Sequence, residues 1–293
     1  MTAPPRGGVV VVDKPSGWTS HDVVGRVRRL AGTRKVGHAG TLDPMATGVL
    51  VLGIERATRL LGHLQLADKE YLATVRLGAA TTTDDAEGEV TSTTDASHLT
   101  AEQVEAALVP LRGEIDQVPS SVSAIKVDGQ RSYARVRAGE QVELKARRVT
   151  VAELVAEQVR VDHGFVDVDV RVTCSSGTYV RALARDVGDA LGVGGHLTVL
   201  RRTRVGAFGL GVAATLDQLA VQFSVVPLDE VARATFDAVD LDEEAARHVG
   251  FGRALPDTTL PSAGPVALFA PDGRFLALYE QAGDDARPVA VFV

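Results

Sequence analysis

The glycine-rich stretch 37–48, GHAGTLDPMATG, holds the densest group of residues with chemical potential. Its small residues let the backbone approach a ligand closely, and His38 and Asp43 are its prominent reactive side chains. Asp43 precedes Pro44, and an isolated Asp-Pro pair is more often only a turn. The loop contains neither GxGxxG nor GxxxxGK[ST], so we expect no nucleotide cofactor.

Other kinds of catalytic site find little support. The seven histidines include no pair spaced i, i+3 or i, i+4, so no metal site is expected. The chain has no GxSxG turn to present a serine nucleophile. Cys174 ends an alternating apolar run and is predicted to be a buried structural thiol. Asp43 therefore remains as the candidate catalytic residue, and basic residues and isolated tyrosines elsewhere in the chain could assist it.

The charge of the chain is unevenly distributed. The net charge of −7 argues against a nucleic-acid binder when taken alone. However, residues 1–219 hold 26 Lys and Arg against 26 Asp and Glu, whereas residues 220–293 hold 5 against 12. The acidity therefore belongs to the last part, and the neutral part has basic clusters at 26–35, 126–148 and 201–204. If these converge on one face, RNA would meet a locally positive surface.

The length and composition fit one large domain and one small one. The 293 residues are 45% hydrophobic and 24% charged, as in ordinary globular proteins. The start, MTAPPRGG, lacks the apolar core of a signal peptide, and no apolar run is long enough to cross a membrane. The single cysteine excludes an internal disulfide. We expect a cytoplasmic protein without a membrane partner.

Strand and helix signals surround the glycine-rich loop. Residues 8–13 read as a buried strand, and Thr19 with Asp22 forms a capping-box signal for a helix that ends before Gly32. Strands are predicted at 49–54 and 71–77. The stretch 113–150 looks like an irregular basic insertion.

The second half continues with a predicted antiparallel hairpin. Two alternating runs, 149–161 and 165–174, are joined by Asp162-His163-Gly164. Thr178 is expected to open a helix, and 197–210 to form a strand that carries arginines. After about residue 225, a helix at 240–249 and short apolar runs broken by Pro and Gly indicate a small β-rich module.

Five segments in order resemble the TruB family of tRNA pseudouridine synthases. GHAGTLDPMATGVL resembles the family's catalytic signature. The other four are VVDKPSGWTSHDVV at 11–24, KEYLATVRLG at 69–78, CSSGTYVRALARDVG at 174–188 and HLTVLRRTRVG at 196–206. The resemblance implies an α+β fold with a mixed, mainly antiparallel sheet. We expect a catalytic domain over 1–225, with the insertion at about 113–150, and a PUA-like module over 226–293.

By this resemblance Asp43 is the catalytic aspartate and Arg181 is the arginine that pairs with it. The carboxylate would help to break the uracil–ribose bond, so that the base can rotate and rejoin through carbon 5. A carboxylate is ionised at neutral pH and can act as a nucleophile or stabilise a cationic sugar. Attack on the sugar, attack on the base and removal of a sugar proton all stay open at this stage.

The resemblance also assigns the residues that handle the base. Tyr71 would stack on it and assist loss of the proton at carbon 5, and Tyr179 and Leu200 would line its pocket. His38 would fill the space left by the extruded nucleotide, which offsets the cost of unstacking. Val122 stands where many relatives have an aromatic residue, so an aromatic contact from the insertion is in doubt.

The expected activity is therefore conversion of uridine 55 in the T-arm loop of tRNA to pseudouridine. We expect a monomer that needs neither cofactor nor metal. Arg147 and Arg148 are predicted to contribute to tRNA binding, and the acidic module to contribute less. The alternative is a tRNA-binding folding chaperone without catalysis, against which an intact Asp43, Tyr71 and Arg181 argue. A glycosidase would need a second carboxylate near Asp43, and the sequence nominates none.

Overall fold

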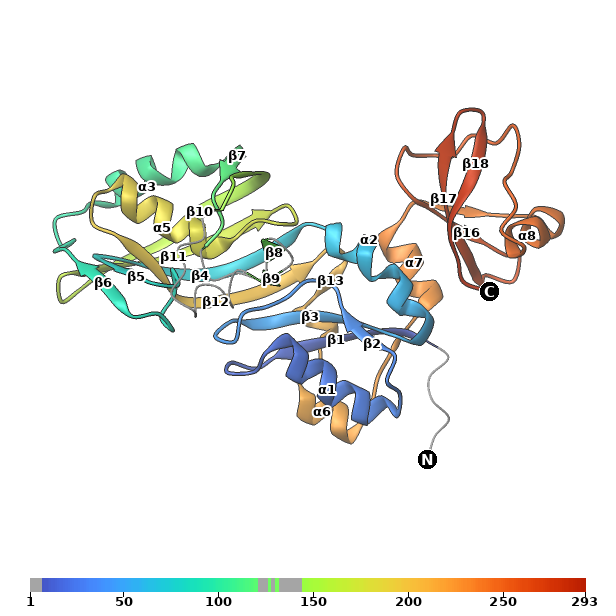
Figure 1. Cartoon of the computed structure of the whole chain (residues 1–293), viewed down its shortest axis with the longest axis horizontal. Coiled ribbons are helices and arrows are strands. Elements are labelled where there is room, and N and C mark those ends of the chain that lie inside the picture. Colours follow the sequence, from blue (N-terminus) through green and yellow to red (C-terminus); the bar gives the residue numbers. More distant parts are fainter. Residues whose placement is uncertain (1–6, 121–125, 128–129, 132–143) are drawn as a thin grey trace.

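The computed structural model describes residues 7–120, 126–127, 130–131 and 144–293. A long twisted sheet carries helices at both of its ends, and a smaller sheet forms a separate module (Figure 1). Val122 and half of the predicted insertion lie outside the described residues. Within the described residues, no helix is long and apolar enough to cross a membrane.

The large sheet confirms the predicted mixed, mainly antiparallel architecture. Its strand order is β14-β1-β3-β12-β4-β11-β10-β7, with β2 paired to β3 and β13 paired to β12. The exception to antiparallel pairing in this sheet is β12 beside β3. Its strands are β1 (Gly8–Lys14), β2 (Val36–His38), β3 (Thr47–Ile54), β4 (Lys69–Leu77), β7 (Gly113–Gln117), β10 (Arg147–Asp162), β11 (Phe165–Cys174), β12 (Gly195–Val205), β13 (Phe208–Gly209) and β14 (Val226–Pro227).

The predicted helix signals are largely confirmed. Thr19 and Asp22 form the capping box of α1 (Ser20–Ala31), and Gly32 ends this helix in a left-handed conformation. The helix expected from Thr178 is α5 (Val180–Ala190), which begins after Tyr179. The other helices in the described part of the chain are η1 (Glu55–Leu60), α2 (Leu61–Leu66), α3 (Ala101–Leu108), η2 (Val109–Leu111), η3 (Leu210–Val212), α6 (Leu216–Val221), α7 (Leu228–Thr235) and α8 (Glu243–Gly250).

The sheet separates two hydrophobic cores. On β1, Val10 and Val12 pack into the core formed with α1, α6, α3 and α5, whereas Val9 and Val11 point into the core on the opposite face. Because β1 is buried on both faces, its sequence is a continuous apolar run rather than an alternating one. Strand β4 alternates instead, since its outer face carries polar residues such as Arg76, which pairs with Asp167 of β11.

The predicted hairpin is present, and both ends of the predicted insertion belong to the main sheet. Strands β10 and β11 are antiparallel and join at Asp162 and Phe165 through His163 and Gly164. The ends of 113–150 are not irregular, because Gly113–Gln117 pairs with the start of β10 in the main sheet. Two short pairs lie outside this sheet, β5 (Ala79–Thr81) with β6 (Val90–Thr93), and β8 (Lys126–Val127) with β9 (Gln130–Arg131).

The last part of the chain forms a four-stranded sheet that packs on the rest of the protein. It contains β15 (Ala238–Asp240), β16 (Val266–Phe269), β17 (Phe275–Ala282) and β18 (Asp285–Val291). Phe269, Phe275 and Phe292 share one core with β1 and β3. Arg56 of η1 also donates a hydrogen bond to the carbonyl oxygen of Phe292 at 2.8 Å. The module is thus bound to the large sheet through a common core, and the boundary at 225/226 stays a prediction.

Candidate active site

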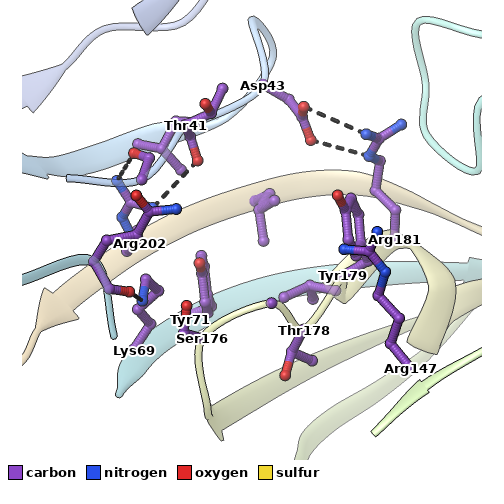
Figure 2. Close-up of a pocket in the computed structure, with 16 residues that line it drawn as sticks. Thr41, Asp43, Lys69, Tyr71, Arg147, Ser176, Thr178, Tyr179, Arg181 and Arg202 are labelled. Carbon is purple, nitrogen blue, oxygen red and sulfur yellow. Dashed lines mark hydrogen bonds and ion pairs between the residues drawn. The ribbon is translucent and has the colours of Figure 1, made fainter. Parts of the chain in front are cut away.

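A cavity of about 370 Å³ opens over the middle of the large sheet, where the glycine-rich loop faces the start of α5 (Figure 2). Strands β4 and β12 also contribute to its walls. Asp43, Tyr71, Tyr179, Arg181 and Leu200, which the sequence predicts as site residues, all line it. The other lining residues are Gly40, Thr41, Leu42, Gln65, Lys69, Arg147, Ser176, Gly177, Thr178, Val180 and Arg202.

Asp43 and Arg181 form a two-point ion pair at this cavity (Figure 2). The Nε of Arg181 lies 3.0 Å from Oδ2 of Asp43, and Nη2 donates to Oδ1 at 3.3 Å. The Arg181 side chain is only 5% exposed, whereas the Asp43 side chain is 34% exposed. Two parallel contacts fix the orientation of a carboxylate better than one, so Asp43 presents a defined face to the cavity.

A second carboxylate holds Arg181 from its other side. Nη1 of Arg181 lies 3.3 Å from Oδ2 of Asp85 and donates to the carbonyl oxygen of Thr83 at 2.8 Å. The Asp85 side chain is 3% exposed, and Asp85 does not line the cavity. The arginine is therefore braced between two acids, of which only Asp43 lines the cavity. This arrangement does not supply the second carboxylate that a glycosidase would need there.

Lys14 fastens the loop immediately after Asp43. Its buried ammonium group donates to the carbonyl oxygens of Pro15 at 2.9 Å, Trp18 at 2.7 Å and Pro44 at 3.1 Å. Burial lowers the pKa of Lys14 to about 8, partly offset by the charge of Asp43. The lysine at the end of the buried strand β1 thus ties the turn after that strand to the Asp43 loop.

Arg202 fastens the loop before Asp43. This arginine is 1% exposed and donates to the carbonyl oxygens of Val49 at 2.7 Å, Gly40 at 3.2 Å and Thr41 at 3.4 Å. Gly48 lets the two segments meet, because a Cβ there would lie 2.1 Å from the carbonyl oxygen of Arg202. With both flanks held, the loop presents Asp43 from a rigid backbone.

The aromatic residues come from opposite walls. Tyr71 lies on β4 directly opposite Arg202 of β12, and burial raises the pKa of its phenol. Tyr179 is half-buried just before α5, and Leu200 is buried on β12. The cavity therefore has apolar surfaces beside the Asp43–Arg181 pair, a combination that suits a flat base next to a charged group.

His38 stands apart from these residues. It ends β2, does not line the cavity and stacks edge-on against His21 of α1, with ring centroids 5.9 Å apart. Burial lowers the pKa of His38, so its imidazole is neutral at neutral pH. The structure thus places it at the start of the glycine-rich loop and not among the cavity walls.

Two of the basic clusters contain arginines that are already paired within the protein. Arg147 lines the cavity, whereas Arg148 forms exposed ion pairs with Glu114 and Asp116. The cluster at 201–204 is not a free surface for RNA, because Arg202 is buried and its neighbours are paired within the chain. Arg201 binds Asp13 and Arg204 binds Asp68, each at 2.7 Å.

The sequence did not predict several residues that hold the site together. They are Lys14, Lys69, Asp85, Gln117 and Arg202, all of them buried polar residues. Lys14 had one usable signal, since a cation directly after a buried strand needs a partner. Within the described residues, no group of three or more His, Cys, Asp or Glu side chains is arranged to hold a metal ion.

Comparison with known proteins identifies the class that this fold and site define. Residues 28–180 match the domain described as TruB family pseudouridylate synthase (N terminal domain). Residues 236–293 match the domain described as tRNA Pseudouridine synthase II, C terminal, and 181–241 match the tRNA pseudouridylate synthase B C-terminal domain. The chain belongs to the TruB family of pseudouridylate synthases.

Individual relatives match this chain over nearly its whole length. The protein named tRNA pseudouridine synthase B from Thermobifida fusca is 60% identical over 289 residues, covering 97% of this chain and 98% of the relative. Its namesake from Streptomyces griseus is 57% identical over 290 residues, covering 97% of both. A chain in the crystal structure of a Cbf5-Nop10-Gar1 complex superposes with a TM-score of 0.74 at 27% identity, covering 98% of this chain and 85% of that one.

Proposed function

We propose that this protein converts uridine 55 in the T-arm loop of tRNA to pseudouridine, with Asp43 as the reacting carboxylate. The observation that carries the proposal is the Asp43–Arg181 ion pair beside a cavity walled by Tyr71 and Tyr179. The relatives named tRNA pseudouridine synthase B support tRNA as the substrate. The chaperone alternative is less favoured because it gives no reason for such a site.

The reaction is an isomerisation, so the substrate supplies every atom of the product. The bond from N1 of uracil to the ribose breaks, the base turns, and carbon 5 bonds to the same ribose carbon. Carbon 5 then loses its proton and N1 gains one. A carboxylate held by two guanidinium contacts can attack the sugar, attack the base or take up a sugar proton. Each of these roles requires Asp43 to keep one orientation, which Arg181 enforces.

The cavity is suited to a base that has left its stack. Enzymes that act on a base inside folded nucleic acid extrude it, at a cost of roughly a few kcal/mol. We propose that Tyr71 stacks on the extruded uracil, that Tyr179 and Leu200 close the pocket, and that His38 fills the space left in the RNA. Because burial raises the pKa of Tyr71, its phenol is neutral when the base arrives, and assistance to proton loss would come from a neutral hydroxyl.

The charge distribution supports only a few contacts between arginines and RNA phosphates beside the cavity. Arg147 lines the cavity, so we assign it a phosphate contact. Arg148 is already engaged by two carboxylates and would contribute less. We further propose a catalytic domain over 1–225, a PUA-like module over 226–293, and a monomeric enzyme acting in the cytoplasm.

The test replaces the carboxylate without changing its shape. Unmodified tRNA transcript is incubated with wild-type protein, Asp43→Asn and the control Asp68→Asn, whose carboxylate pairs with Arg204 and does not line the cavity. We expect pseudouridine at position 55 from wild type and the control. Asp43→Asn should give no product but keep its tRNA affinity. Product from Asp43→Asn would refute the role of Asp43, and tRNA binding without product from wild type would favour the chaperone.

A further inference from the structure

Gln117 reaches across from the end of β7 to the backbone of Tyr179. Its side-chain Nε2 donates to the carbonyl oxygen of Tyr179 at 3.0 Å, and the Tyr179 amide donates to its Oε1 at 2.8 Å. The residue is only 2% exposed and does not line the cavity. One amide side chain thus satisfies both main-chain groups of a residue 62 positions away in sequence.

Tyr179 lies where a small change in the backbone would move two proposed site residues. It is the N-cap residue of α5, with extended φ and ψ of −102° and 106°, and its own side chain makes no capping hydrogen bond. Arg181 follows two residues later in the first turn of α5 (Figure 2). A rotation of the chain at Tyr179 would shift its ring in the cavity wall and tilt the helix start that aims Arg181 at Asp43.

A primary amide suits this position because it carries both a donor and an acceptor. Leucine has a similar volume but offers neither, so it removes the acceptor of the Tyr179 amide and one of the donors to the Tyr179 carbonyl, which keeps its bond from the Leu183 amide at 3.3 Å. An ionised glutamate keeps the acceptor and turns its second oxygen, another acceptor, toward the Tyr179 carbonyl. A protonated glutamate regains a donor, so its pairing with Tyr179 depends on pH.

We propose that Gln117 is a positioning residue for the reaction, acting through the main chain of Tyr179. The proposal rests on the proposed function, because it assumes that Tyr179 closes the pocket on the uracil. It predicts that Gln117 governs turnover of bound tRNA rather than tRNA affinity, since the side chain lies behind the cavity wall.

The experiment compares Gln117→Leu and Gln117→Glu with the control Gln281→Leu. Gln281 makes similar side-chain bonds to the main chain, including one from the Leu260 amide at 2.8 Å, but belongs to the C-terminal sheet. We expect Gln117→Leu to lower kcat by about tenfold or more with KM and tRNA Kd nearly unchanged, the scale of a misplaced catalytic group. The control should lower Tm but keep kcat.

Two further measurements separate positioning from general damage. In a Tyr179→Ala background, Gln117→Leu should lower kcat by a smaller factor than in the wild-type background, because the part of the loss that acts through the Tyr179 ring is already gone and only the part through Arg181 remains. The kcat of Gln117→Glu, divided by that of wild type, should rise as pH falls toward 5.5. Wild-type kcat in Gln117→Leu, or the same fold loss with and without the Tyr179 ring, would overturn the proposal. Absence of product from wild type would refute the proposed function and this role with it.

Discussion

Replacing Arg202 with methionine would test whether this arginine holds the loop or binds RNA. The sequence groups Arg202 with Arg201 and Arg204 as a basic cluster, but its guanidinium is buried and bonded to three carbonyl oxygens. Methionine can fill much of the same space but donates no hydrogen bond. The variant therefore leaves the carbonyl groups of Gly40, Thr41 and Val49 without this partner.

The expected loss of stability in Arg202→Met follows from those three hydrogen bonds. The 2.7 Å bond to Val49 is a strong one, whereas the bonds of 3.2 and 3.4 Å are weaker. Leaving a buried acceptor unpaired costs about 1–3 kcal/mol, and removing the buried charge returns part of the loss. We expect a net loss of about 3 kcal/mol in the free energy of unfolding, which for a chain of this size lowers Tm by about 6–12 °C. Loosening the loop should also lower kcat by about tenfold or more.

Thermal melts, turnover of tRNA and salt-dependent tRNA binding together decide between the two roles. The control is Arg204→Met, because Arg204 forms a partly exposed pair with Asp68 that is worth at most about 1 kcal/mol. We expect Arg202→Met to keep the wild-type slope of log affinity against log salt concentration. A slope reduced by about one, with Tm and kcat unchanged, would mean that Arg202 contacts phosphate and would refute the buried-clamp role.

Three further predictions concern other parts of the fold. The pKa of Lys14 is lowered to about 8, so between pH 8 and 10.5 the unfolded chain binds the proton more tightly, and stability should rise with pH. Urea unfolding at pH 7.5 and 9.5 should show that the free energy of unfolding rises less with pH for Lys14→Met than for wild type. An equal rise in both proteins would contradict this prediction. Cys174 is buried with its pKa raised to about 11, so a thiol reagent at pH 8 should label it only after unfolding; rapid labelling of folded protein would show that the site is open. Ending the chain at residue 235 should lower Tm, because it removes Phe269, Phe275 and Phe292 from the core shared with β1, and an unchanged melt would show that the module is merely attached.

The local features of this protein follow from its sequence. The capping box at Thr19 and Asp22, the hairpin turn at His163 and the buried strand at 8–13 each depend on residues close together in the chain. Their physics is local, since it involves neighbouring hydrogen bonds, left-handed turn residues and side-chain periodicity. The loop that carries Asp43 is marked in the same way by its glycines, and resemblance to a family placed the other site residues in order.

The partners of the buried polar residues were decided only by the tertiary structure. Arg181 lies 138 positions from Asp43 in sequence, Arg202 lies 162 from Gly40, and Gln117 lies 62 from Tyr179. No local pattern tells whether an arginine on a strand faces solvent, a phosphate or a buried carbonyl. The sheet decides this when β12 pairs with β3 and β4, because a buried arginine such as Arg202 then needs its hydrogen-bond partners inside the protein. The sequence alone thus determined the loop, whereas the folded sheet determined what holds it in place.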